Sequence, residues 1–186
     1  MIEPVAKQIT VAVFASDRGP GDAERATLMT QTGNYFARRG ARLLTLAEGG
    51  VMPVTLITAA RTAGGAVEVV ADASSHLPPV LTDVPIHVAA DSAERQALIA
   101  TRAQALVGLP GSLASAAALF ATWSAARQQG RVLPVILLNR HRAFEVVRGF
   151  SADVLSHSLR GHERALQFAE TVEDLWNRTQ RLVEAR

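Results

Sequence analysis

The sequence contains no cysteine, one tyrosine and a single lysine, Lys7. Without cysteine, the chain can form neither a disulfide nor a thiolate metal site. The 19 basic residues face 17 acidic ones, so the formal charge is only +2. The high pI of 9.9 reflects the scarcity of groups that titrate above neutrality. A large basic face is therefore not expected, and neither is a nucleic-acid partner.

Metal-ligand patterns are also missing. The histidines show no HxxxH or HxH spacing and no acidic cluster beside them, so neither a metal site nor a cofactor is expected. They are His76, His87, His141, His157 and His162. Residues 1–10 lack the apolar core of a signal peptide. Residues 108–126 are uncharged but too rich in small and polar residues for a membrane span. We expect a soluble, cytoplasmic chain with no membrane partner.

Short apolar segments alternate with helical patterns along the chain. The predicted strands are residues 9–15, 42–47, 66–71, 86–89, 105–109, 133–138 and 164–168. The predicted helices run from about Asp22 to 39, over 53–63, from Asp91 or Ser92 to about 102, over 113–126, and from Thr171 onward. A turn is expected at 17–21. The alternation predicts one doubly wound α/β domain over 1–186, a Rossmann-like parallel sheet with helices on both faces.

Residues 109–118 predict a strand end, a tight turn and a helix start. The first-turn N–H groups of a helix have no intrahelical acceptors, and they form an electropositive end that suits a phosphate. The predicted phosphate ligands here are Pro110, Gly111, Ser112 and Ser115. The alternative is an ordinary strand–helix turn with an N-cap. No charged residue or histidine lies between Arg102 and Arg127, so the segment brings no carboxylate of its own.

The order of these pieces resembles the LOG family, nucleoside monophosphate phosphoribohydrolases of the cytokinin type that are often labelled lysine decarboxylases. It also resembles the related molybdenum-cofactor carrier-like proteins. Arg95 lies fifteen positions before Pro110, which is the family's spacing between its arginine and the P-G-G-x-G-T-x-x-E motif. Residues 133–139 resemble the K-P-V-G-L-L-N strand, 14–16 the F-x-G-S strand end, and 50–52 the G-[LIV]-M helix start. The likeness spans about residues 9–140.

This resemblance implies a dimer that binds a nucleoside monophosphate at the carboxyl ends of the strands, with Ser16 and Gly50 among the ligand-binding residues. It also implies that Arg95 clamps the phosphate or assists reaction at the ribosyl group. The alternative for Arg95 is a solvated helix arginine paired with Asp91 or Glu94, which contributes less than about 1 kcal/mol.

The departures from the family pattern are concentrated at the motif positions that bind phosphate or carry out catalysis. Ser112 and Ala114 stand where the motif has glycines, and Ser115 where it has threonine. Ala118 replaces the motif glutamate, and Gln96 replaces the lysine after the arginine. Side chains in place of glycine weaken or reshape a phosphate cradle. An alanine can neither stabilise an oxocarbenium-like centre nor activate water.

Glu48 is the nearest substitute carboxylate, because it ends the second predicted strand at the same sheet edge. Its alternative role is that of a turn residue. Asp17 and Asp72 are weaker candidates and are expected to cap helices or form turns.

Three functions remain open from the sequence. The first is binding of a small phosphorylated ligand, with phosphoribohydrolase chemistry weakened or lost. The second is surviving hydrolysis of an N-glycosidic bond through Glu48. The third is a non-catalytic interaction protein, in which helix 113–126 serves as a dimer or hetero-oligomer face. A homodimer is expected from the family.

Overall fold

The computed structural model describes residues 8–16 and 22–186. These residues form a seven-stranded sheet in the order β4-β3-β2-β1-β5-β6-β7, with every neighbouring pair parallel. The strands are β1 (Thr10–Phe14), β2 (Arg42–Ala47), β3 (Ala66–Ala71), β4 (Ile86–Val88), β5 (Ala105–Gly108), β6 (Val135–Leu138) and β7 (Leu166–Ala169). The predicted α/β class and parallel sheet are confirmed.

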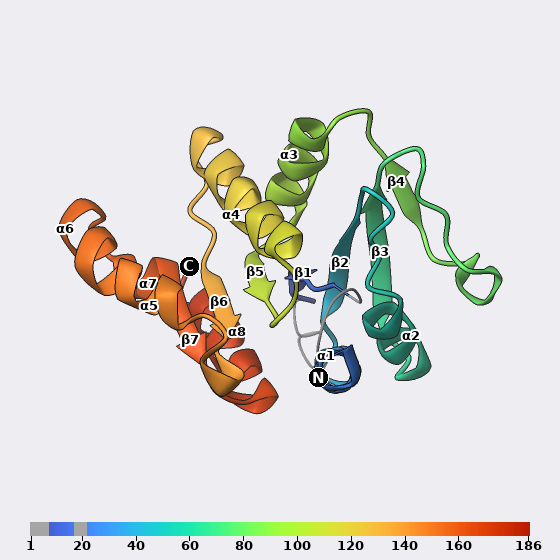
Figure 1. Cartoon of the computed structure of the whole chain (residues 1–186), viewed down its shortest axis with the longest axis horizontal. Coiled ribbons are helices and arrows are strands. Elements are labelled where there is room, and N and C mark those ends of the chain that lie inside the picture. The colour runs from blue at the N-terminus through green and yellow to red at the C-terminus, as the bar shows by residue number, and fades with distance from the viewer. Residues whose placement is uncertain (1–7, 17–21) are drawn as a thin grey trace, which may run out of the picture.

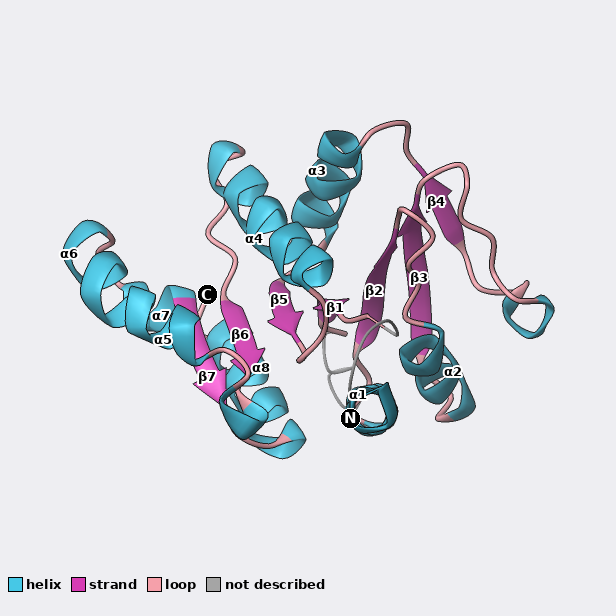
Figure 2. Ribbon diagram, in the orientation of Figure 1, coloured by secondary structure: helices cyan, strands magenta, loops and turns pink. Residues whose placement is uncertain are grey.

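Helices cover both faces of this sheet (Figures 1 and 2). Helices α1, α2 and α8 lie on one face, and α3 and α4 lie on the other. Their bounds are α1 (Asp22–Arg38), α2 (Val54–Thr62), α3 (Ser92–Arg102), α4 (Leu113–Gln128) and α8 (Val172–Glu184). Short helical segments complete the chain: η1 (Pro79–Leu81), η2 (Arg140–Arg142), α5 (Glu145–Phe150), η3 (Ser151–Leu155), α6 (Ser156–Ser158) and α7 (His162–Ala165). Within the described residues, no helix is long and apolar enough to cross a membrane.

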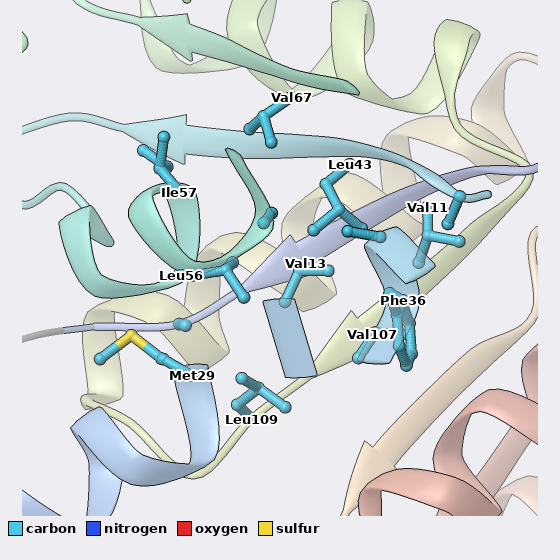
Figure 3. Close-up of a cluster of buried hydrophobic side chains, with 14 of the residues drawn as sticks. Val11, Val13, Met29, Phe36, Leu43, Leu56, Ile57, Val67, Val107 and Leu109 are labelled. Atoms are coloured by element: carbon cyan, nitrogen blue, oxygen red, sulfur yellow. The ribbon is translucent and has the colours of Figure 1, made fainter. Parts of the chain in front are cut away.

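The hydrophobic core is divided by the sheet into two clusters. Val11 and Val13 of β1 face the cluster beneath α1, α2 and α8, which Figure 3 shows. Ala12 and Phe14 of the same strand face the cluster beneath α3 and α4. Because side chains alternate between the faces of a strand, burial on both sides requires nearly continuous apolar runs. This is the pattern that the sequence carries.

The structure corrects two strand predictions. The strand expected at 133–138 begins at Val135, because Pro134 has no N–H to donate to a ladder. The strand expected at 164–168 is β7, which starts at Leu166 because α7 occupies the residues before it. The expected helix caps hold: the side chains of Asp91 and Thr171 accept from the backbone N–H groups three residues on. The turn expected at 17–21, with Asp17, lies outside the described residues.

Glu68 of β3 contacts two arginines and a histidine. Its side chain is 8% exposed and accepts hydrogen bonds from Arg42 at 2.6 Å, from His87 Nε2 at 2.7 Å and from Arg102. Burial raises the pKa of Glu68, but the hydrogen bonds from His87, Arg42 and Arg102 outweigh it and lower the pKa below the ordinary value of 4.5. The ionised carboxylate therefore stabilises the folded state.

Replacing Glu68 by glutamine is expected to lower the free energy of unfolding at pH 7 by about 1–3 kcal/mol. A depressed folded-state pKa contributes stability above the unfolded value and loses it as the pH falls through the folded value. The difference in free energy of unfolding between wild type and Glu68→Gln should therefore decrease below about pH 4.5. Urea unfolding at pH 7 and pH 3.5 measures this. A gap that stays constant over this range would contradict the assignment.

Candidate functional site

The predicted site residues gather at the carboxyl-terminal edge of the central strands. From β1, the chain winds outward through β2, β3 and β4, and then β5 returns to the other side of β1. The edge between β1 and β5 is therefore the topological switch point, where open α/β sheets bind ligands. Ser16 follows β1, Glu48 follows β2 and Gly111 follows β5. In Figure 1, β1 lies between β2 and β5, and a loop leads from the end of β5 back to the start of α4.

Helix α4 begins in a capping box formed by two of the predicted phosphate ligands. The Ser112 hydroxyl accepts from the Ser115 backbone N–H at 3.2 Å, and the Ser115 hydroxyl accepts from the Ser112 N–H at 3.1 Å. Both hydroxyls thus cap the start of α4, as expected for an ordinary strand–helix turn with an N-cap, which was the alternative to a phosphate site. The N–H groups of Leu113 and Ala114 lie in the first turn, where no helical carbonyl precedes them. They are the amides that an anion could reach.

Gly111 lets the β5–α4 turn approach the end of β1. A Cβ at this position would lie 2.7 Å from the Ser115 hydroxyl oxygen and 3.4 Å from the backbone nitrogen of Ser16. Ser16 is itself buried, with 1% of its surface exposed. Gly111, Ser16 and Ser115 are thus brought together, as the sequence predicted. The turn is packed so closely that a side chain at Gly111 would displace its neighbours.

Arg95 and Glu48 form an ion pair beside this turn. Arg95 Nε donates to Glu48 Oε2 at 2.9 Å, and a second guanidinium nitrogen donates to the Ala89 carbonyl at 2.9 Å. The Ser92 hydroxyl donates to the same Glu48 oxygen at 3.2 Å. Arg95 is 7% exposed. The alternative of a solvated arginine paired with Asp91 or Glu94 is wrong, because Arg95 is buried and its carboxylate partner is Glu48. Asp91 and Glu94 accept from backbone N–H groups around the start of α3.

A two-residue turn sets the position of Glu48. The backbones of Glu48 and Val51 exchange hydrogen bonds of 3.1 and 3.0 Å around Gly49 and Gly50. Both glycines have a left-handed φ, of 61° and 71°. A type I′ turn requires this conformation, which glycine adopts without steric cost. Gly49 and Gly50 form the exposed tip of this turn, between Glu48 and Val51.

Asp72, from the end of β3, ties this turn to the sheet. Its carboxylate accepts from the Gly49 N–H at 2.7 Å and from the hydroxyls of Ser74 and Ser75 at 2.7 and 2.8 Å. The hydrogen bonds from Gly49, Ser74 and Ser75 hold the pKa of Asp72 well below its usual range. The expectation that Asp72 forms a turn is confirmed.

A cavity of about 40 Å³ lies where Glu48 meets the first turns of α4. Glu48, Ser115 and Ala118 line it together, and the remaining walls come from Phe14, Ala15, Leu46, Val51 and Ala114. Glu48 therefore borders the same space as Ala118, the position where the resembled motif has its glutamate. Among the described residues in this lining, the only acidic one is Glu48, which comes from the end of β2, and the residues that α4 contributes are uncharged.

The structure unites some predicted residues and not others. Glu48 and Arg95 are joined, as are Ser16, Gly111 and Ser115, but neither Pro110 nor Gly50 lines the cavity. Sequence reasoning missed Ser92 as a partner of Glu48, although it placed Ser92 at the start of a helix. Across residues 8–16 and 22–186, no group of three or more histidine, aspartate or glutamate side chains could hold a metal ion.

The fold and the position of the site define an α/β Rossmann-like protein with a candidate site at its switch point. No family model matches the sequence, and no curated protein matches it. Solved structures do share the fold. The molybdenum cofactor carrier protein from Chlamydomonas reinhardtii is 19% identical, with a TM-score of 0.68 over 96% of this chain and 99% of that one.

Two further structures cover the chain to a similar extent. The molybdenum cofactor binding protein from the phototrophic bacterium Rippkaea orientalis is 16% identical, with a TM-score of 0.63 over 97% of this chain and 99% of that one. A structural genomics target, TM1055, is 20% identical, with a TM-score of 0.66 over 94% and 99%. The expected relationship in fold to molybdenum-cofactor carrier-like proteins is confirmed.

Proposed function

We propose that the carboxyl-edge site binds a small phosphorylated molecule, with a nucleoside monophosphate as the leading candidate. The observation that carries this proposal is the start of α4 at the switch point, where the N–H groups of Leu113 and Ala114 in the first turn have no helical carbonyl before them. The buried Arg95 lies at the same edge of the sheet, where its guanidinium pairs with Glu48. The names of the Chlamydomonas and Rippkaea proteins make the molybdenum cofactor a second candidate ligand for the same site.

Binding of AMP, GMP or ribose 5-phosphate should raise the melting temperature of the wild type. At a hundredfold excess over Kd, the gain is about 2.7 kcal/mol, or roughly 5–10 °C for a chain of this size. Gly111→Ala is expected to reduce AMP affinity at least about tenfold, because the new Cβ would crowd Ser115 and Ser16. Thermal shift and calorimetry measure both effects.

Gly149→Ala is the matched control for this substitution. It makes the same chemical change in α5, where a Cβ meets nothing within 4 Å. Its AMP affinity should equal that of the wild type. A wild type without any shift for AMP, GMP, ribose 5-phosphate or inorganic phosphate would reject the binding proposal.

A second candidate function is hydrolysis of the N-glycosidic bond of a nucleoside monophosphate. The specific observation is that Glu48 borders the same cavity as Ala118 and is held there by Arg95. In this reaction, water adds to the anomeric carbon, the bond to the base nitrogen breaks, and the base leaves with a proton. AMP would yield adenine and ribose 5-phosphate. The Glu48 carboxylate would stabilise the oxocarbenium-like centre or accept the proton from water.

We further propose that the chain forms a homodimer through α4. Leu113 in its first turn is 87% exposed, and no charged residue interrupts the helix before Arg127. Light scattering of the wild type should give twice the monomer mass of 19.8 kDa. Leu113→Asp should shift the population toward monomer, because it introduces a charge into an apolar interface. A monomeric wild type would reject this proposal.

A further inference from the structure

A second and larger cavity lies at the opposite edge of the sheet. Its volume is about 600 Å³, within the usual range for small-molecule sites. It is bounded by the segments that enter β6 and β7 and by the last turns of α4 and α8. Figure 1 shows the C-terminal end, α7 and the start of β6 close together at this edge. The candidate site lies at the other ends of the strands, so the two sites are separate.

Arginine dominates the wall of this cavity. Five of the 18 arginines line it, and the lining includes no aspartate or glutamate. They are Arg127, Arg160, Arg164, Arg181 and Arg186. Elsewhere, arginines such as Arg42, Arg95 and Arg148 pair with glutamates. Of the five, only Arg186 donates a side-chain hydrogen bond within the part of the chain that the structure describes, to the Gln104 carbonyl at 3.4 Å.

Ordinary helix capping accounts for only part of this cluster. Arg127 and Arg181 lie in the last turns of α4 and α8, where a cation interacts favourably with the helix dipole. Arg160 precedes Gly161 in a loop, and Arg164 lies within the four-residue α7, so neither ends a long helix. Their convergence with the other three comes from the tertiary fold.

The cavity wall is also electrostatically unbalanced. Arg131 lies beside it and donates to the carbonyls of Ala100 and Ala103. Burial and the neighbouring Arg131 guanidinium lower the pKa of Arg186. Arginines gathered without aspartate or glutamate side chains among the described lining residues raise the local positive potential, which a bound anion relieves. Guanidinium groups in a shared pocket suit phosphate oxygens through paired N–H donors.

The cavity also has an apolar side. Leu159, Leu182, Val132 and Pro134 line it together with the arginines. Val132 is 57% exposed. A ligand that fills this space therefore combines several negative charges with a flat apolar group. A single phosphate can engage only part of the cluster, whereas a di- or triphosphate chain can reach several guanidinium groups.

We propose that this cavity is a binding site for a nucleoside di- or triphosphate. The phosphate chain contacts Arg160, Arg164 and Arg181, and the nucleoside lies against Leu159 and Leu182. The site is independent of the function proposed for the carboxyl edge. A nucleic acid fits less well, because the arginines line a concave pocket and the whole chain carries a formal charge of only +2.

Calorimetry with ATP in 0.15 M salt and saturating AMP tests the proposal, since AMP occupies the other site if that site binds it. The wild type should bind ATP saturably, and more tightly than it binds tripolyphosphate. Arg160→Gln/Arg164→Gln should weaken ATP binding at least tenfold, and Arg181→Gln, on a separate helix, should weaken it severalfold. All three side chains are exposed, so the variants should keep the wild-type melting temperature.

Two controls separate this site from general charge effects and from the carboxyl edge. Arg38→Gln removes the same charge from the last turn of α1, outside the cavity, and should leave ATP affinity unchanged. Gly111→Ala should also leave it unchanged. The proposal is overturned by an absence of saturable ATP binding, or by an equal loss in Arg38→Gln or Gly111→Ala. Tripolyphosphate that binds as tightly as ATP, or a single-stranded oligonucleotide that displaces ATP at lower concentration, would also overturn it.

Discussion

Glu48→Gln is expected to lower the release of adenine from AMP at least about a hundredfold, the range in which a general acid–base group contributes. Glutamine keeps the size of the side chain and can still accept from Arg95 and Ser92, but it can neither accept a proton nor carry the charge. Chromatographic detection of free adenine measures the rate. AMP affinity, measured separately, distinguishes a loss of chemistry from a loss of binding.

Glu170→Gln is the matched control. It removes a carboxylate from another arginine pair, with Arg148 at 3.2 Å, on the exposed surface, and it should leave adenine release unchanged. Wild-type protein that binds AMP but releases no adenine would reject hydrolysis and leave the binding function intact. Equal rates in wild type and Glu48→Gln would remove Glu48 from the reaction.

Gly33→Ala is expected to destabilise the fold by about 1–3 kcal/mol, the usual cost of overpacking. Gly33 lies in α1 where α2 crosses it. A Cβ there would lie 2.7 Å from the Leu56 carbonyl oxygen and 3.0 Å from the Ala60 nitrogen. Both atoms belong to the backbone of α2, so the two helices would have to separate. The melting temperature should fall by roughly 2–10 °C in calorimetry.

Gly149→Ala again serves as the control. It changes a helical glycine in open space, and alanine there should stabilise by up to about 1 kcal/mol through helix propensity. If Gly33→Ala lowers the melting temperature and Gly149→Ala raises it, the close α1–α2 crossing is the cause of the loss in Gly33→Ala. Equal changes would show that helix propensity alone decides both.

The central strands were predictable because they are buried on both faces. The predicted bounds of β2 and β3 agree with the structure, since each is a mostly apolar run that is followed directly by an acidic residue, Glu48 or Asp72. The segment between Asn139 and β7 gave no such pattern. Its short helices leave Val146 and Phe150 exposed, so no buried face repeats at helical spacing.

The candidate site was only partly predictable. Topology alone brings Glu48 to the same edge as Gly111, because the carboxyl ends of parallel strands meet there. The ion pair of Glu48 with Arg95 joins residues 47 positions apart and depends on how α3 enters the sheet. The arginine cavity had no sequence signal at all. Its residues come from four separate segments. In the sequence, each of its arginines taken alone is typical of a solvated surface charge.

The shared border of Glu48 and Ala118 has a consequence for comparing relatives. Both positions line one cavity of about 40 Å³, and carboxylates at both would repel each other. We therefore expect positions 48 and 118 to covary across homologues. Where position 118 in α4 is alanine, position 48 should be acidic. Where position 118 is glutamate, position 48 should be small or neutral. A sequence alignment would show only that this chain lacks a glutamate at position 118. A structural superposition would show that Glu48 lines the same cavity.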